Sequence, residues 1–93
     1  MAEWRFLSNH AHVLLCVAGD PDMRLRDIAG SLDITERTTH RIVSELVEDG
    51  YLARERVGRR NRYTLLDQLP LRDPMLREQK VADLLRLLKT VDR

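Results

Sequence analysis

Side chains suited to burial recur at helical spacing through the middle of the chain. Residues three and four apart share one face of a helix, and five such residues lie together on one face: Thr39, Ile42, Val43, Leu46 and Val47. Thr35 is a good N-cap, and Gly50 can end the helix because glycine adopts the left-handed conformation without steric penalty. The pattern therefore predicts one amphipathic helix over residues 35–49, with a polar face left exposed.

Two shorter helices are predicted before this one. Ser8 can cap a helix over residues 9–18, whose apolar residues form a broad stripe: Val13, Leu14, Val17 and Ala18. A second helix over residues 26–32 has no good N-cap and would bury Ile28, Ala29 and Leu32. Asp33 then makes a tight turn into the long helix. Two helices joined by a short turn, the second with a polar exposed face, form a helix-turn-helix.

A β-hairpin is predicted directly after the long helix, with strands over residues 51–57 and 61–66. Tyr63 and Leu65 alternate with Arg62 and Thr64, which gives one buried face and one wet face. The turn is expected over residues 58–61, where Gly and Asn tolerate positive φ. The hairpin would form the wing beside the helix-turn-helix.

The pattern changes after residue 66. A linker with two prolines precedes a last helix, which Asp73 can cap and Pro74 can begin, and which runs to about residue 91. Its apolar positions repeat as a short seam: Val81, Leu84, Leu88 and Val91. Fewer than three heptads cannot form a free coiled coil. The seam must therefore pack on the chain's own first helix or on a second subunit, and we favour a homodimer.

These elements predict an α+β fold: three core helices, a two- or three-stranded wing and a C-terminal helix. Residues 24–65 resemble the winged helix-turn-helix core of the MarR and ArsR families of transcription regulators, and the similarity extends over residues 13–66. Ala29 and Ile42 match the family pattern, whereas Asp33 stands where glycine is usual and Thr39 where valine is common. The resemblance implies a DNA-binding unit over residues 1–66 with an N-terminal arm (1–7). Residues 67–93 would add a linker and a dimerisation helix to the same structural unit.

Charge is concentrated rather than high overall. The net charge of the 93 residues is only +1, but residues 51–66 hold five Arg against one Glu, a balance of +4. Such a segment suits a localised contact with an anion. The single Cys16, the lack of a signal pattern in the first residues and the absence of a long apolar run favour a cytoplasmic protein without a membrane span.

The predicted function is sequence-specific binding of double-stranded DNA by a homodimeric regulator. The long helix would enter the major groove and the wing would lie on the minor groove or phosphates. The alternative for the wing is a solvated hairpin whose arginines prevent edge aggregation. The candidate DNA contacts are Thr35, Arg37, Thr38, His40, Arg41, Ser44, Arg54, Arg56, Arg59, Arg60 and Arg62.

No catalytic motif occurs, so we expect neither an enzyme nor a cofactor. His10, His12 and Cys16 have side chains that bind zinc or copper, but a site needs three or four ligands and Cys16 lies in an apolar run. No metal site is therefore predicted. Two alternatives remain: a winged helix used as a protein-interaction module, and a metal-responsive ArsR-like repressor. A small-molecule effector is possible, although the sequence shows no pocket for one.

Overall fold

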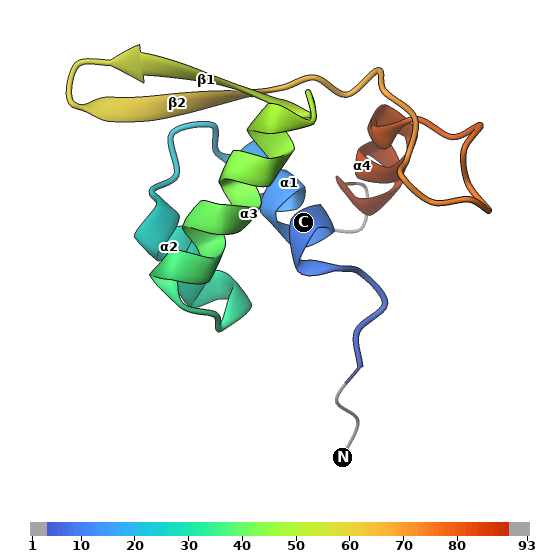
Figure 1. The fold of residues 1–93 in the computed structure, drawn as a ribbon, viewed down its shortest axis with the longest axis horizontal. Coiled ribbons are helices and arrows are strands. Elements are labelled where there is room, and N and C mark those ends of the chain that lie inside the picture. Colours follow the sequence, from blue (N-terminus) through green and yellow to red (C-terminus); the bar gives the residue numbers. More distant parts are fainter. Residues whose placement is uncertain (1–3, 90–93) are drawn as a thin grey trace.

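The computed structural model describes residues 4–89, and it contains four helices and one hairpin within that range (Figure 1). In chain order these elements are α1 (Asn9–Gly19), α2 (Leu25–Leu32), α3 (Glu36–Glu48), β1 (Leu52–Val57), β2 (Arg60–Leu65) and α4 (Val81–Lys89). The α+β winged helix-turn-helix predicted from the sequence is therefore confirmed. The wing has two strands. No helix in the described range is long and apolar enough to cross a membrane.

The helix ends follow the predicted capping residues. The Ser8 hydroxyl accepts a hydrogen bond from the backbone N–H of Ala11 at 3.1 Å, and the Thr35 hydroxyl accepts one from Thr38 at 3.0 Å. Each bond satisfies an amide that the first helical turn leaves free. Gly50, at φ +89°, ends α3, and the next amide bonds back to the Leu46 carbonyl at 2.9 Å. As the sequence indicated, α2 has no side-chain cap.

Asp33 makes the turn between the two helices of the motif. It has φ 58° and ψ 46°, which is the left-handed conformation. The backbone N–H of Ile34 then bonds to the Ala29 carbonyl at 3.1 Å, so the turn closes tightly on the end of α2. Thr39, at a position where valine is common in the MarR and ArsR families, is fully buried and donates its hydroxyl to the Thr35 carbonyl at 3.0 Å. That bond lets a hydroxyl occupy the core.

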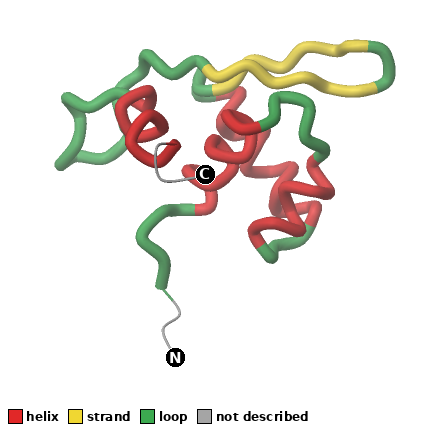
Figure 2. Tube along the Cα trace, turned by 180° about the vertical axis from the view of Figure 1, so that it is seen from behind, coloured by secondary structure: helices red, strands yellow, loops and turns green. Residues whose placement is uncertain are grey.

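The wing is a tight antiparallel hairpin that projects beyond the helices, as the view from behind shows (Figure 2). Its loop is two residues long, with Gly58 at φ +64° in the position that a type II′ turn gives to glycine. The predicted turn over residues 58–61 was too long, because Asn61 already pairs with Arg56 in the ladder. The second strand therefore begins at Arg60, one residue earlier than predicted.

One hydrophobic core joins all parts of the described chain. It brings together side chains from α1, α2, α3, both strands and α4: Val13, Leu14, Val17, Ile28, Leu32, Ile42, Val43, Leu46, Leu52, Tyr63, Val81 and Leu85. The faces predicted to be buried on the first three helices are the faces that form this core. Burial of these stripes, rather than intrinsic helix propensity, is what stabilises short helices such as α2.

The last helix begins later than predicted. Residues before Val81 form a loop, closed by an isolated bridge between Pro70 and Lys80 and by a 2.8 Å bond from the Leu71 N–H to the Gln79 carbonyl. The Asp73 carboxylate bonds the N–H of Met75 at 2.9 Å within a turn instead of capping a helix. Met75 is 91% exposed, so a helix over this segment would have little apolar surface to bury.

Candidate nucleic-acid interface

The polar face of α3 is presented to solvent as predicted. Arg37, His40 and Arg41 are exposed, while Thr38 and Ser44 are half-buried beside them. Thr35 is exposed at the start of the helix, but its hydroxyl is already used twice, as acceptor from the Thr38 N–H and as donor to the Thr38 hydroxyl at 2.9 Å. The structural role of Thr35 therefore competes with any contact to a ligand.

Arg41 is not a free cation. One guanidinium nitrogen lies 3.2 Å from Oε2 of Glu45, one turn further along α3, and the other oxygen of Glu45 lies 2.8 Å from Nε2 of His10 on α1. The hydrogen bond from His10, followed by the charge and hydrogen bond of Arg41, lowers the pKa of Glu45. Glu45 therefore stays charged and links the exposed face of α3 to α1.

Strand register divides the wing arginines between two faces. In an antiparallel ladder, directly paired residues point to the same side of the sheet. Arg54 pairs with Tyr63, and Arg56 pairs with Asn61, on the face that also carries Leu52. Arg60 and Arg62 belong to the opposite face, with Arg59 at the tip; all five are exposed.

Asp22, in the loop before α2, holds two of these arginines. The Arg60 guanidinium donates to the Asp22 carbonyl, and Nε of Arg62 lies 3.5 Å from the Asp22 carboxylate. The backbone N–H of Tyr63 also bonds to the Pro21 carbonyl at 3.1 Å. The wing is thus fixed against the helix-turn-helix by its second strand.

Three arginines are left available at this interface. The guanidinium groups of Arg37 on α3, Arg54 on β1 and Arg59 at the tip of the wing make no ion pair or hydrogen bond with any residue in the range 4–89. Arg56 donates to the Gly58 carbonyl at 3.2 Å and so braces the turn. Among the predicted arginines, the structure thus separates free guanidinium groups from bound ones. Sequence reasoning missed Glu45, His10 and Asp22, the partners of the bound ones.

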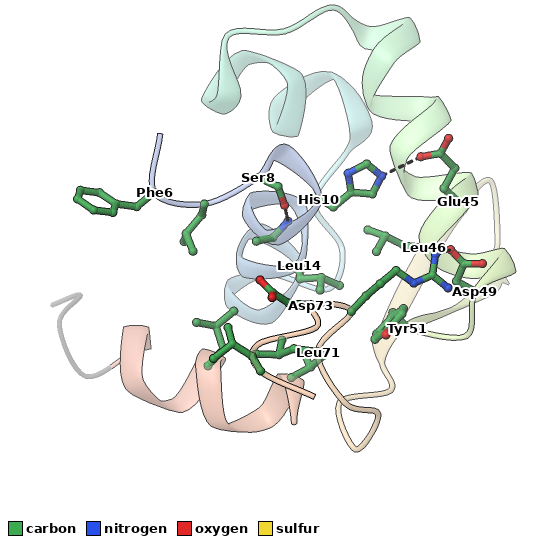
Figure 3. A pocket seen from close by; sticks show the side chains of 16 residues that line it. Phe6, Ser8, His10, Leu14, Glu45, Leu46, Asp49, Tyr51, Leu71 and Asp73 are labelled. Carbon is green, nitrogen blue, oxygen red and sulfur yellow. Dashed lines mark hydrogen bonds and ion pairs between the residues drawn. The ribbon is translucent and has the colours of Figure 1, made fainter. Parts of the chain in front are cut away.

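A groove that the sequence did not indicate lies on another side of the helices (Figure 3). Its volume is about 880 Å³, and it lies between the start of α1, the second half of α3 and the chain around residues 71–76. Leu14, Leu46 and Leu71 line it, with His10 and Glu45 at one edge. The walls come from segments at least 20 residues apart in the sequence, so no local pattern could have revealed the groove.

No metal centre is evident in the described part of the chain. Within residues 4–89, no three His, Cys, Asp or Glu side chains gather as ligands would. His10 is bonded to Glu45, and Cys16 is half-buried against the core, where burial raises the pKa of its thiol. Two of the three candidate ligands are therefore engaged elsewhere, His10 with Glu45 and Cys16 with the core.

The predicted dimer seam on α4 turns partly inward. Val81 and Leu85 are only 2% and 4% exposed and belong to the chain's own core. Leu84 and Leu88 are half-buried, and Val91 lies outside the described residues. Val81 therefore packs on its own chain, which was the other arrangement that the sequence allowed. A dimer interface on this helix remains a prediction.

Comparison with known proteins identifies the family. Residues 7–56, just over half of the chain, match the IclR helix-turn-helix domain. The chain belongs to the IclR helix-turn-helix family. The matched range runs from the residue before the cap of α1 into the first strand of the wing, so it contains the whole helix-turn-helix. The winged helix-turn-helix regulator expected from the sequence is confirmed, although the family whose sequence pattern matches is IclR.

The fold of this IclR-type domain is shared with a solved structure. The zinc-dependent MarR-family transcriptional regulator AdcR, in its Zn(II)-bound state, superposes with a TM-score of 0.51 at 20% sequence identity. The match covers 72% of this chain and 47% of AdcR, so the chain matches about half of that protein's length. At this identity the likeness shows the fold alone. No curated protein sequence matches significantly.

Proposed function

We propose that this IclR-type domain binds double-stranded DNA as part of a homodimeric transcription regulator in the cytoplasm. α3 enters the major groove, and the wing lies along the minor groove or its phosphates. The observation that carries the proposal is the placement of free guanidinium groups on both elements: Arg37 on α3, and Arg54 and Arg59 on the wing. Arginine binds phosphate and guanine through paired N–H donors.

The remaining candidate residues have different roles in this proposal: some contact the DNA, and others also position the wing. Arg41 contacts bases while bonded to Glu45, and His40, Thr38 and Ser44 contact the backbone nearby. Arg60 and Arg62 set the angle of the wing through Asp22 and approach phosphate with their remaining N–H groups. Any small-molecule effector would occupy the groove between α1 and α3, whose volume lies in the range of ligand sites.

The test separates base reading by α3 from phosphate contact by the wing. Arg37→Ala should cost roughly 1–3 kcal/mol on a preferred duplex and relax its sequence preference, because a base contact is lost. The double variant Arg54→Ala with Arg59→Ala should weaken all duplexes alike. It should also flatten the slope of log K against log salt concentration by roughly one unit per lost phosphate contact. Binding would be titrated at several salt concentrations on selected and scrambled duplexes.

Arg77→Ala is the matched control, because Arg77 is exposed in the loop before α4 and belongs to neither α3 nor the wing. This variant should leave the affinities for the selected and for the scrambled duplex unchanged. If the α3 and wing variants lose affinity identically on both duplexes, the assignment of base reading to α3 is wrong. Weak binding that ignores sequence and tolerates Arg37→Ala would instead favour a protein-interaction module, whose basic wing meets an acidic partner.

A further inference from the structure

Glu45 connects the exposed face of α3 to α1 through two contacts. One carboxylate oxygen bonds Nε2 of His10 at 2.8 Å, and the other pairs with Arg41 at 3.2 Å. Figure 3 shows His10 and Glu45 facing each other across the edge of the groove. All three side chains are partly exposed, so the network lies at the surface beside the proposed DNA interface.

We infer that His10 and Glu45 are positioning residues that hold Arg41 in the orientation in which it reads a base. The inference rests on the proposed function, because it names the residues that set the specificity of that same interface. Arg41 is the residue that touches DNA. Glu45 and His10 act through it.

The physical argument concerns the freedom of the arginine side chain. An unrestrained arginine loses considerable rotamer entropy when it docks on a guanine edge. A partner that fixes the guanidinium beforehand removes part of that loss. Because guanidinium has five N–H donors, the bond to Glu45 leaves others free for a bidentate contact with guanine. Arg37, which has no such partner in the described range, lacks this preorganisation.

His10 matters because Glu45 alone is also mobile. A carboxylate on one helix can follow the arginine it pairs with, and such exposed pairs are weak. The hydrogen bond from His10 on α1 holds the Glu45 carboxylate in place relative to a second helix. The carboxylate can then hold the Arg41 guanidinium in one orientation. The arrangement has a cost, because a carboxylate near the DNA repels phosphates of every sequence. The network therefore lowers general affinity while it sharpens sequence preference.

The experiment compares a duplex selected from a random library by the unmutated protein with a scrambled duplex of equal length and composition. The variants are Glu45→Gln and His10→Ala, each also combined with Arg41→Ala. Glu48→Gln removes the same charge three residues further along α3, and His12→Ala removes a neighbouring imidazole; neither side chain bonds Arg41. Thermal unfolding followed by circular dichroism would show that each variant is folded.

We expect Glu45→Gln and His10→Ala each to reduce the ratio of selected to scrambled affinity roughly three- to tenfold, the range expected for coupled neighbours. Glu45→Gln should also raise affinity for the scrambled duplex. In the Arg41→Ala background, neither change should alter the ratio. His10→Gln, which retains an N–H donor, should recover most of the preference. The two control variants should leave the ratio unchanged.

Two results would overturn the inference by different routes. The first is that Glu45→Gln and His10→Ala reduce the ratio equally with and without Arg41, or do not reduce it at all. This result would show that the two residues do not act through Arg41, while DNA recognition by α3 would still stand. If the unmutated, folded protein does not discriminate between any duplexes, the proposed function fails and the positioning role fails with it.

Discussion

At the scale of single residues, Asp33 shows strain that a sequence change can relieve. A left-handed backbone costs an ordinary L-residue roughly 1–2 kcal/mol, less for Asp, and costs glycine nothing. Asp33→Gly should therefore raise the free energy of unfolding by about 0.5–1 kcal/mol, and Asp33→Ala at the same φ of 58° should lower it. In urea denaturation, the Asp33→Gly variant should be the most stable, the unmutated protein should be intermediate, and the Asp33→Ala variant should be the least stable. The opposite order would mean that the Asp33 side chain stabilises the turn.

Cys16 is expected to react slowly. Burial raises the pKa of its thiol above that of a free cysteine, so the thiolate, which is the nucleophile, is scarcer at pH 8. Alkylation by iodoacetamide at pH 8, followed by mass spectrometry, should be several-fold slower than for glutathione, and should speed up when the protein is unfolded in urea. A folded-state rate equal to that of glutathione would instead indicate an accessible, activated thiol and would reopen the question of a metal ligand.

Residues whose partners are close in sequence were predictable, and those with distant partners were not. Ser8, Thr35 and Gly50 act on amides and carbonyls within a few positions, so their capping roles follow from residue type and spacing. The partner of His10 is 35 residues away, and the partner of Arg60 is 38 residues away. The exposed arginines of α3 and the wing could be named from the sequence, but which of them are bound within the chain could not.

At the scale of elements, the first question is whether α4 is anchored in the hydrophobic core. Leu85 is 4% exposed within the core cluster, so Leu85→Ala should lower the free energy of unfolding by about 2–4 kcal/mol through lost burial and a residual cavity. Met75→Ala, at a 91% exposed position in the loop before α4, is the control and should cost clearly less. Equal losses in urea denaturation would mean that α4 is not anchored through Leu85.

The late start of α4 shows where pattern reasoning fails. Asp73 and Pro74 favour the start of a helix, and they favour a turn equally well. Which of the two forms depends on how much apolar surface the following side chains can bury. The chain bonds residues 69 and 71 to residues 81 and 79 instead, which closes the loop before the helix. By contrast, α1 and α3 were located to within about a residue, because each carries an apolar stripe and a cap that agree.

At the scale of the whole molecule, the proposed DNA interface and the last helix occupy different sides. In Figure 1, α2 and the tip of the wing lie on one side of α1 and α3, and α4 lies on the other. A second subunit bound through α4 would thus leave α3 and the wing uncovered. Two copies related by a two-fold axis would then present two α3 helices, which suits half-sites about one helical turn apart on DNA.

The exposed part of α4 therefore carries the last prediction, which concerns assembly. Leu84 and Leu88 are half-buried and Leu87 is 65% exposed, a surface more apolar than a solitary helix face usually presents. Leu84→Asp combined with Leu88→Asp should convert the proposed dimer to a monomer in sedimentation velocity, since charges there would be desolvated in an interface. The variant should keep its helical circular dichroism, because the core positions of α4 are Val81 and Leu85.

The Arg54→Ala, Arg59→Ala wing variant is the control and should sediment as the unmutated protein does. The monomeric variant should also bind a single half-site with near-normal affinity while losing its preference for two correctly spaced half-sites, because only the coupling between subunits has been removed. An unmutated protein that sediments as a monomer at about tens of micromolar would contradict this assembly. The seam of α4 would then be explained by its packing on the chain's own core, and α3 would have to recognise DNA from one copy at a time.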